Sequence, residues 1–535
     1  MLQVFIIVLM LKLKKKYWVA WFTVLSCYVV LLLGCDNLHR NKSHPEITNS
    51  NIRKGKALAA IYCQSCHALP DPDLIDTKTW EKGVLPQMGP RLGIFSWNNI
   101  NYPSARGDMN WSRNFYPDKP VVKPEEWKNI MDYYVATSPD TLPGQYRKQV
   151  IKNDLSLFKI LKPALHYTAP FTSFVKIQSE NSLSPVIISD AQKQNIYFLN
   201  QQLKAIDSVH TNFGQVVNID FKPNEIVGCN IGIMNPHNGR FGKAQLISYS
   251  NNKRLLNQTP LFEGLQRPVE ITSADLNKDG KLDYIVCEFG YLTGALSWMQ
   301  NMSNNKYRKN IIRPFPGAIK AYINDYNKDG LPDIWVLFAQ GEEGVFLFTN
   351  KGNGRFEQRE VLRFPPVYGS SYFELADFNK DGFEDIVYTC GDNADYSTVL
   401  KPYHGVYIFI NDGKNNFKQE YFFPINGCYK AIPRDFDGDG DLDLATISFF
   451  ADYSRQPEEG FVYLENEGNY KFQPYSHPAT QVGRWLTMDA GDVNGDGKTD
   501  LILGNFSVAP FNRKPVIDWK QGPPFIVLQN IGKKK

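Results

Sequence analysis

The sequence lacks the short motifs that mark the common hydrolases and nucleotide-binding enzymes. Residues 166–535 contain no G-x-S-x-G turn, no H-E-x-x-H helix and no phosphate-binding G-x-x-x-x-G-K-[ST] loop. The histidines of this part are scattered and have no metal-ligand spacing: His166, His210, His237, His404 and His477. These absences argue against a familiar catalytic centre in the C-terminal two thirds of the chain.

An excess of charge of either sign is also missing. The formal net charge is +4 over 535 residues. The first 34 residues hold four lysines and no acidic residue, so the remainder carries a net charge of about 0. Nothing in this balance indicates a nucleic acid as partner.

The N-terminus reads as an export signal. Lys12, Lys14, Lys15 and Lys16 precede an apolar run from Tyr17 to Leu33, which ends in Leu-Leu-Gly-Cys35. This ending resembles the lipobox of bacterial lipoproteins and implies cleavage before Cys35, which would then carry lipid. An uncleaved membrane-spanning anchor is the alternative, because the run is only slightly short for a span. Met10 is an alternative start.

A heme-attachment motif follows the predicted tether. Cys63-Gln-Ser-Cys66-His67 has the C-x-x-C-H spacing at which two thiols bond the porphyrin vinyl groups and His67 ligates the iron. A zinc half-site would require a second Cys/His pair nearby, yet the next cysteine is Cys229. A redox dithiol would require a βαβ context, which is absent.

The flanks of this motif predict two helices, over 51–62 and 124–136. The region resembles a small class I cytochrome c, a family whose first and last helices cross where a glycine meets an aromatic residue. That resemblance implies contact of Gly55 with Tyr133 or Tyr134.

Three methionines compete for the sixth iron position. Met88 lies in a W…LPxM stretch similar to that of cytochrome domains fused to repeat domains, and it is the preferred ligand. Met109, in a polar stretch, is the alternative, whereas Met131 is expected in the core of the closing helix. Thioether ligation raises the reduction potential of the heme.

From about residue 166 the chain repeats. The motif D-x-[ND]-x-D-G-x-x-D occurs five times, and its alternating oxygens with a glycine at the bend are typical of a wrapped Ca²⁺ loop. The predicted ligands are Asp275, Asn277, Asp279, Asp283, Asp325, Asn327, Asp329, Asp333, Asp377, Asn379, Asp381, Asp385, Asp435, Asp437, Asp439, Asp443, Asp492, Asn494, Asp496 and Asp500. The twelfth positions lack the bidentate Glu of an EF-hand, and the flanks are short apolar strands, so we expect strand-to-strand loops.

A second pattern counts the repeats. An apolar strand ending in asparagine occurs seven times, at Asn200, Asn251, Asn301, Asn350, Asn411, Asn466 and Asn530. A multi-stranded repeat of about 50 residues indicates a β-propeller, here with seven blades of which the first two lack calcium. Their degenerate loops are expected near Ser189-Asp190 and Asp220. We expect an early strand, Phe171 to Ile177, to close the ring as the outer strand of the last blade.

One mouth of the ring is expected to gather residues that lie just outside the strands. These are Phe289-Gly290, Cys390-Gly391, Arg484-Trp485 and Gly504-Asn505. Glycines and aromatics also serve blade packing, so this grouping is a weak indication of a ligand site.

The five intact loops resemble the FG-GAP or VCBS repeats of integrin-type propellers. The whole chain resembles bacterial lipoproteins that join a class I cytochrome c domain to such a propeller. The expected fold is therefore mixed, with a small all-α cytochrome c domain before an all-β propeller. The expected boundaries are 1–34 signal peptide, 35–50 tether, 51–145 cytochrome c domain, 146–165 linker and 166–535 propeller.

Three functions remain open at this point. The first is an electron carrier in the cell envelope, with one covalent heme c, up to five Ca²⁺ ions, and a redox protein or small molecule as donor or acceptor. The second is an oxidoreductase whose propeller oxidises a substrate and passes electrons to the heme. The third is an adhesion or glycan-binding lipoprotein. No acidic run follows Cys35, so we expect a membrane anchor facing the periplasm.

Four further cysteines have two possible states. In an oxidising compartment they could form two disulfides, with three possible connectivities. They could equally be buried free thiols. The residues concerned are Cys229, Cys287, Cys390 and Cys428.

Overall fold

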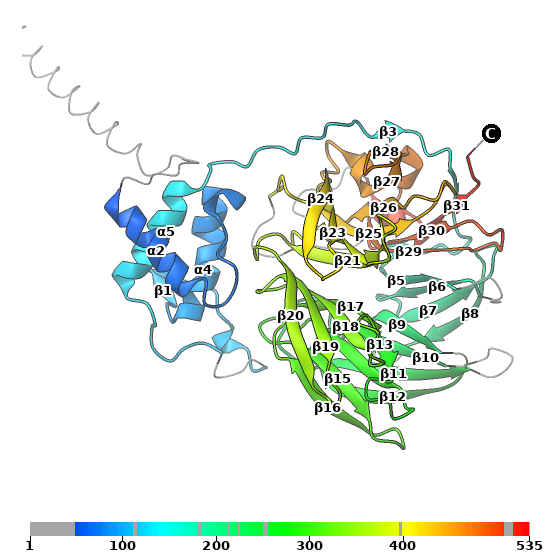
Figure 1. The fold of residues 1–535 in the computed structure, drawn as a ribbon, viewed down its shortest axis with the longest axis horizontal. Helices are drawn as coiled ribbons and strands as arrows, with labels where there is room; N and C mark the ends of the chain where they lie inside the picture. Colours follow the sequence, from blue (N-terminus) through cyan, green and yellow to red (C-terminus); the bar gives the residue numbers. More distant parts are fainter. Residues whose placement is uncertain are drawn as a thin grey trace, which may run out of the picture. The chain divides into compact units, whose positions relative to one another are not determined.

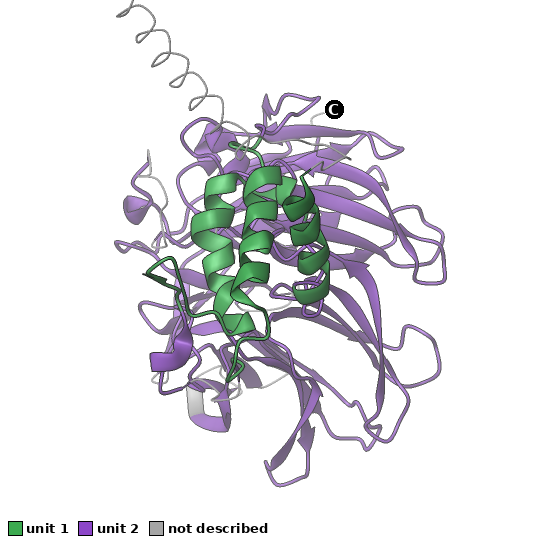
Figure 2. Ribbon diagram, turned by 90° about the vertical axis from the view of Figure 1, so that its left-hand side faces the viewer, with its two compact units in different colours: residues 1–62, 71–103, 116–142 green, residues 63–70, 104–115, 143–535 purple. Residues whose placement is uncertain are grey.

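The computed structural model describes residues 49–110, 115–178, 184–211, 214–222, 225–249, 255–394, 399–507 and 517–533. The predicted signal peptide and Cys35 lie outside these residues. Among the described residues no helix is both long and apolar enough to cross a membrane. The chain divides into two compact units, residues 1–62, 71–103 and 116–142, and residues 63–70, 104–115 and 143–535 (Figure 2).

The first unit is mainly helical. Its elements are α2 (Ser50–Tyr62), η1 (Pro72–Leu74), α3 (Thr77–Thr79), η2 (Trp80–Val84), α4 (Leu85–Met88), η3 (Gly89–Leu92), β1 (Ser96–Trp97), β2 (Ile100–Asn101) and α5 (Pro124–Thr137). Both predicted long helices are confirmed as α2 and α5. The two-stranded ladder of β1 and β2 was not predicted, so the expectation of a purely helical domain was wrong in this detail.

The two long helices cross at a glycine. A Cβ atom added to Gly55 would lie 1.9 Å from the carbonyl oxygen of Asn129 and 2.9 Å from Cβ of Tyr133. Only glycine allows backbones this close. The expected contact between Gly55 and Tyr133 is therefore confirmed. The face of α5 that packs here is apolar, with Trp127 and Ile130 fully buried.

The second unit is a seven-bladed β-propeller, as predicted (Figure 1). Short helices lie outside the blades: η4 (Ala105–Gly107), η5 (Pro457–Gly460), η6 (Pro478–Thr480) and η7 (Trp519–Gln521). Blade one holds β5 (Thr172–Ile177), β6 (Val186–Asp190), β7 (Asn195–Leu199) and β8 (Ala205–His210), and blade two holds β9 (Val216–Lys222), β10 (Glu225–Asn230), β11 (Gly242–Tyr249) and β12 (Leu255–Leu265). Blade three holds β13 (Pro268–Ala274), β14 (Asp283–Glu288), β15 (Ala295–Asn301) and β16 (Tyr307–Arg313). Blade four holds β17 (Ala318–Asn324), β18 (Asp333–Phe338), β19 (Gly344–Asn350) and β20 (Phe356–Arg363).

The remaining three blades complete the ring. Blade five holds β21 (Ser370–Ala376), β22 (Asp385–Cys390), β23 (Gly405–Asn411) and β24 (Phe417–Pro424). Blade six holds β25 (Cys428–Arg434), β26 (Asp443–Ser448), β27 (Phe461–Asn466), β28 (Phe472–Ser476) and β3 (Lys152–Asn153). Blade seven holds β29 (Trp485–Gly491), β30 (Asp500–Asn505), β31 (Phe525–Asn530) and β4 (Phe158–Leu161). The second strands are apolar and fully buried, for example Asp333–Phe338, because neighbouring blades cover both of their faces.

The ring closes with a strand from before the first blade, but not the one we predicted. β4 pairs antiparallel with β31 and supplies the outer strand of blade seven. Residues 172–177 instead form β5, the innermost strand of blade one, so that expectation was wrong. The segment 146–165, expected to be a linker, contributes β3 and β4 to the ring. The alternation of buried residues in 172–177 fits either place, which is why the sequence pattern did not separate them.

The innermost strands are tied to one another around the ring. At each of the seven blade junctions, a side chain of one inner strand hydrogen-bonds the inner-strand backbone of the neighbouring blade. The pairs, in ring order, are Ser173 with Val216, Asn218 with Ile271, Glu270 with Ala321, Tyr322 with Phe373, Ser371 with Cys428, Lys430 with Met488 and Asp489 with Ile177. These bonds satisfy backbone groups that no strand of the same blade reaches.

Candidate functional site

The five D-x-[ND]-x-D-G-x-x-D motifs lie at equivalent places in the ring. Each joins the first strand of a blade to the second, in blades three to seven. The glycine at the sixth position has a positive φ in every copy, for example +82° at Gly280 and +95° at Gly440, which L side chains rarely adopt. The prediction that blades one and two lack the intact loop is confirmed by this placement.

The expected remnants of the loop in the first two blades are placed less well. In blade two, Asp220 lies in β9, close to the turn into β10. In blade one, Ser189 and Asp190 lie at the far end of β6, on the opposite side from the turn between β5 and β6, so that expectation was wrong. Asp190 binds the backbone of Phe171, Gln192 and Lys193 at 2.7 to 3.0 Å. It is therefore an anchor of a different turn.

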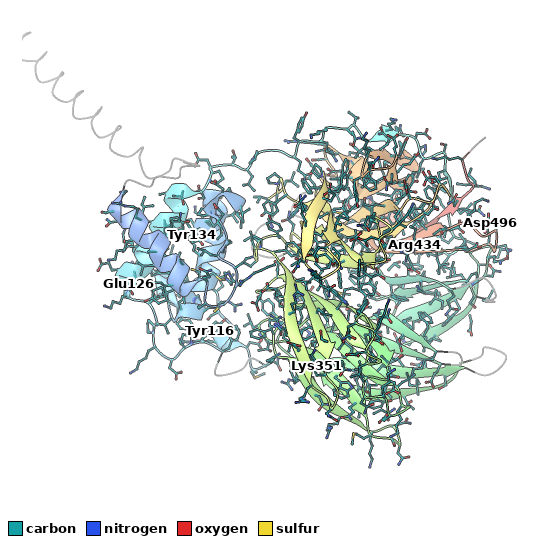
Figure 3. The ribbon with its side chains drawn as sticks, in the orientation of Figure 1. Tyr116, Glu126, Tyr134, Lys351, Arg434 and Asp496 are labelled. Atoms are coloured by element: carbon teal, nitrogen blue, oxygen red, sulfur yellow. The ribbon has the colours of Figure 1, made fainter. Side chains whose placement is uncertain are left out.

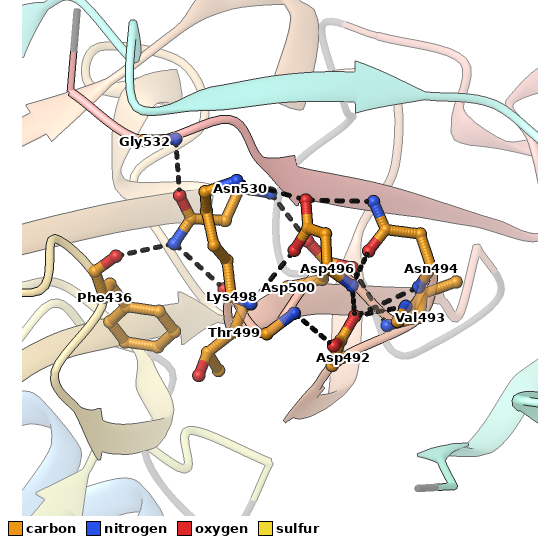
Figure 4. Close-up of polar contacts among 12 residues, drawn as sticks. Phe436, Asp492, Val493, Asn494, Asp496, Lys498, Thr499, Asp500, Asn530 and Gly532 are labelled. Atoms are coloured by element: carbon orange, nitrogen blue, oxygen red, sulfur yellow. Dashed lines mark hydrogen bonds and ion pairs between the residues drawn. The ribbon is translucent and has the colours of Figure 1, made fainter. Parts of the chain in front are cut away.

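The first aspartate of each loop holds the bend. In blade seven, Asp492 Oδ1 accepts the backbone N–H of Gly495 at 2.7 Å, and Oδ2 accepts that of Gly497 at 2.7 Å (Figure 4). The first aspartates of the other loops likewise accept the sixth-position N–H: Asp275, Asp325, Asp377 and Asp435. The loops thus have a wrapped backbone that directs carboxylate oxygens inward.

The last aspartate of each loop joins the two sequence patterns into one unit. Asp500 Oδ1 accepts the backbone N–H of Asn530 at 2.7 Å, and Asn530 Nδ2 donates to the carbonyl of Thr499 at 3.2 Å (Figure 4). The same exchange joins Asp283 to Asn301, Asp333 to Asn350, Asp385 to Asn411 and Asp443 to Asn466. The strand-ending asparagine is therefore the partner of the loop's ninth position.

Burial makes ionisation of these last aspartates unfavourable. It raises the pKa of Asp443 to about 7 and that of Asp500 to about 6, although backbone N–H groups oppose the shift. In blade six, carboxylate oxygens of Asp435, Asp437 and Asp443 lie within 4.8 Å of one another. Such a group of oxygens is suited to a hard cation such as Ca²⁺.

The C-x-x-C-H segment directly follows α2 in the chain. The backbone N–H of Cys66 contacts the carbonyl of Cys63 at 3.4 Å, so the two cysteines occupy one tight turn. Both are free thiols, Cys66 is exposed, and burial raises the pKa of Cys63 to about 11. Two unpaired thiols three residues apart fit the demands of thioether attachment to a porphyrin.

The ring of His67 has a defined tautomer. Its Nδ1 lies 2.8 Å from the carbonyl oxygen of Ala68, which can only accept, so Nδ1 carries the hydrogen. The lone pair is then on Nε2. A metal-ligating histidine typically donates its other ring N–H to a carbonyl or carboxylate in this way. This local geometry fits an iron ligand.

The three candidate methionines differ in their surroundings. Met131 lies in α5 and its sulfur contacts the hydroxyl of Tyr102 at 3.6 Å, which agrees with the expected core role. Met109 is 98% exposed. Met88, at the end of α4, is half-buried. Figure 3 shows the side chains of this helical unit, with Glu126 and Tyr134 of α5 labelled.

The four propeller cysteines are buried free thiols. Cys229, Cys287, Cys390 and Cys428 lie inside the blades, where burial raises the pKa of each thiol. Of the two states left open, the structure has the unpaired one. A high pKa and full burial make these thiols unreactive.

Sequence patterns missed a polar belt on the innermost strands. Arg434 pairs with Glu374 at 2.6 Å, and Tyr372 donates to the same carboxylate at 3.1 Å. Lys320 forms an ion pair with the buried Glu270 of the neighbouring blade. The sequence signal that could have revealed this belt is a charged residue in the middle of an otherwise apolar strand, as in Ala318–Asn324. An outer strand would not require such a residue at that position.

The residues expected at one mouth do share a face. Phe289, Cys390 and Gly504 lie at or just after the ends of second strands, at the opposite end from the D-x-[ND]-x-D-G-x-x-D loops. Arg484 is 3% exposed there, and its guanidinium lies 3.8 Å from the ring centre of Phe449. This mouth is therefore packed with aromatic side chains, and the structure favours a packing role for these residues.

Comparisons with known proteins agree with the repeats. The FG-GAP-like repeat family matches residues 275–336, 325–388 and 435–503. A T-cell immunomodulatory protein homolog of Plasmodium falciparum is 25% identical over 263 residues, covering 41% of this chain and 35% of that protein. The integrin alpha pat-2 of Caenorhabditis briggsae is 24% identical over 263 residues, covering 42% and 21%. The chain thus spans about a third and a fifth of these relatives' lengths.

Among solved structures, the Pan2 WD40 domain of Neurospora crassa aligns with 72% of this chain and 98% of its own, with 12% identity and a TM-score of 0.43. The Dos1 propeller aligns with 70% and 83%, with 9% identity and a TM-score of 0.43. From the repeat matches, the two relatives and the strand order, the chain carries FG-GAP repeats in a seven-bladed, integrin-alpha-like β-propeller.

Proposed function

We propose that this chain is a heme c lipoprotein of the cell envelope that carries single electrons and docks its partner through a calcium-stabilised propeller. The observation that carries the proposal is the C-x-x-C-H turn, in which two free thiols precede a histidine whose Nδ1 donates to the carbonyl of Ala68. The partner would be a redox protein or a small-molecule electron donor or acceptor.

The residues of the first segment fit a covalent heme. Cys63 and Cys66 would hold the porphyrin, His67 would be the proximal ligand and Met88 the sixth ligand. A heme bound in this way supplies one-electron oxidation and reduction. The chain's own contribution is to fix the end of α2, because the crossing at Gly55 leaves α2 no room to shift against α5.

Substitution of Met88 tests the iron ligation. Met88→Ala should abolish the methionine-to-iron charge-transfer band near the red end of the oxidised spectrum, because the thioether is lost. Met109→Ala is the matched control and should leave the band unchanged, since Met109 is 98% exposed. Survival of the band in Met88→Ala together with its loss in Met109→Ala would transfer the role to Met109.

Calcium is the second part of the proposal. Up to five ions would be bound by the five loops, where the buried ninth-position carboxylate gains a cation that offsets its desolvation. An ion that binds only the folded state stabilises it by mass action. Chelation with EGTA should therefore lower the melting temperature of the propeller by several degrees. An unchanged melting temperature, with no heat of Ca²⁺ binding, would remove calcium from the proposal.

A lipid anchor at Cys35 completes the proposal. Acylation there would tether the chain to a membrane, facing the periplasm. Cys35→Ser should release the protein into the soluble envelope fraction, because the thiol is the acylation site. If the variant stays with the membrane, the uncleaved anchor is the better account.

An adhesive function is the second candidate. It is favoured by the similarity to an integrin alpha and to a T-cell immunomodulatory protein homolog, which covers part of the propeller. Binding of the purified chain to a glycan array or to cell-wall material, without reduction or oxidation by candidate carriers, would support this function. Redox exchange without such binding would support the electron carrier.

A further inference from the structure

The loop of blade six carries more negative charge than the other four loops. It contains five aspartates, at 435, 437, 439, 441 and 443, whereas the loops at 275–283, 325–333, 377–385 and 492–500 each contain three. The difference begins at the third position, where Asp437 replaces the asparagine of the other loops. Carboxylates this close to one another repel unless a cation lies between them.

The chain itself supplies a cation at this loop. The side chain of Asp437 is fully covered, and the partner of its Oδ2 is a lysine from the end of blade seven. The ammonium of Lys533 lies 2.5 Å from this oxygen and 2.8 Å from Oε1 of Glu465. Lys533 thus lies against a proposed calcium ligand, and its own side chain is 52% exposed.

The end of blade seven brings Lys533 to blade six. Asn530 Nδ2 donates to the carbonyl of Phe436, the second residue of the blade-six loop, at 2.6 Å (Figure 4). The next residue, Ile531, donates its N–H to Leu157 at 2.9 Å. The chain after Asn530 therefore runs from the closing strands of the ring to the loop of the neighbouring blade, and Lys533 follows two residues later.

We propose that Lys533 is a tethered counter-cation that competes with Ca²⁺ for the loop of blade six. This inference rests on the calcium binding proposed above. Without Ca²⁺ the ammonium neutralises Asp437 and holds residues 531–533 against the loop. A Ca²⁺ ion takes the carboxylates of Asp437 and its neighbours and displaces the ammonium, so that binding at this one blade frees Lys533. In the loops of blades three and seven a lysine also lies near an aspartate, Lys281 at 3.6 Å from Asp279 and Lys498 at 3.2 Å from Asp496, but each belongs to the loop itself and pairs with its fifth position, because the third position there is an uncharged asparagine.

Amine footprinting of the full chain tests the displacement directly. The protein is acylated with a lysine-selective reagent in EGTA and in Ca²⁺, and each lysine is quantified by mass spectrometry. Modification of Lys533 should rise in Ca²⁺. Lys414 is the internal control, because it also lies three residues after a strand-ending asparagine and is exposed, so its modification should not change. Equal modification of Lys533 in both conditions, while calorimetry records Ca²⁺ binding, overturns the inference but leaves calcium binding in place.

The matched substitutions Lys533→Met and Lys414→Met give a second readout. A partly exposed ion pair contributes about 0.2–1 kcal/mol, so Lys533→Met should tighten one class of Ca²⁺ site by up to about fivefold. The same variant should melt earlier than wild type in EGTA but not in saturating Ca²⁺, whereas Lys414→Met should match wild type in both. A Lys533→Met chain with unchanged affinity in every class of site overturns the competition. Calorimetry without any heat of binding overturns calcium binding and the inference together.

Discussion

Blades three to seven and blade one are built alike but anchored differently. The later five each pair a loop aspartate with the asparagine that ends the third strand. Blade one has the asparagine, Asn200, whose side chain accepts the N–H groups of Gln202 and Lys204 in its own turn, as Asn350 of blade four accepts that of Gly352. The buried aspartate of blade one, Asp190, anchors the opposite end of the sheet.

This difference separates the residues that specify a blade from the residues that specify its loop. All seven sheets have apolar second strands, and all seven junctions carry an inner-strand hydrogen bond, with or without the loop. The apolar strands therefore specify the ring. The aspartate–asparagine unit specifies only the turn between first and second strands, since blade one forms its sheet without a loop aspartate.

The largest loss of stability should come from a substitution in the apolar packing of the strands. Phe158, on the closing strand β4, is 6% exposed and packs edge-on against Phe436 and Tyr463 at 5.9 and 5.6 Å between ring centres. Phe158→Ala should lower the free energy of unfolding by about 3–5 kcal/mol, because it leaves a cavity where the ring closes. Urea unfolding of the propeller measures this loss. The exposed neighbour Lys159 is the control, and Lys159→Ala should change little.

A small loss in Phe158→Ala would break the comparison, since the closing strand would then be dispensable. The structure also corrects the identity of the strand that closes the ring. The sequence pattern indicated that an early strand closes the ring, and this is what the structure has. It indicated the wrong strand, Phe171 to Ile177, because Phe158–Leu161 is only four residues long and has no flanking repeat motif.

An intermediate loss of stability should follow substitution of either kind of aspartate, the loop aspartate of blade five or the turn aspartate of blade one. Asp385 in blade five accepts the N–H groups of Asn411 and Phe378 at 2.8 and 2.9 Å, and Asp190 in blade one accepts three N–H groups. Either change to Ala leaves buried donors unpaired and should cost about 2–4 kcal/mol in EGTA. Added Ca²⁺ should widen the gap between Asp385→Ala and wild type but leave the Asp190→Ala gap unchanged. Equal responses to Ca²⁺ would mean that the blade-five loop binds no ion.

Much of this arrangement was open to prediction, and the limits have physical causes. The blade number and the five loops follow from local patterns with fixed spacing, whereas the crossing at Gly55 was expected from the resemblance to class I cytochromes c. The partnership of Asp500 with Asn530 was not foreseen, since the two residues are 30 positions apart and meet only when the third strand returns to the loop. Lys533 on Asp437 was missed for the same reason, at a separation of almost a hundred residues.

The smallest effect on stability should come from the polar belt on the innermost strands, to which all blades contribute. Lys430 lies with its ammonium 4.5 Å from the ring centre of Tyr372 and donates to the carbonyl of Met488 at 2.8 Å. Burial lowers the pKa of Lys430 to about 8; Asp489 and Glu374 oppose this shift, and Lys320 and Lys176 add to it. The unfolded chain keeps the ordinary value of about 10.4, so between about pH 8 and pH 10 the unfolded state binds more protons. Stability should therefore rise with pH in that window.

Substitution isolates this contribution from the tyrosines that titrate above it. The difference in unfolding free energy between wild type and Lys430→Met should change by about 1–2 kcal/mol from pH 7.5 to pH 10, with wild type gaining. The full shift would give more, but Lys430 is only half-buried and solvent in the ring screens part of it. Lys418→Met, at an exposed position of β24, should show no such change. Parallel curves for wild type and Lys430→Met would mean that the ammonium is hydrated inside the ring. The junction of blades six and seven would then depend, like the others, on its apolar strands rather than on a buried charge.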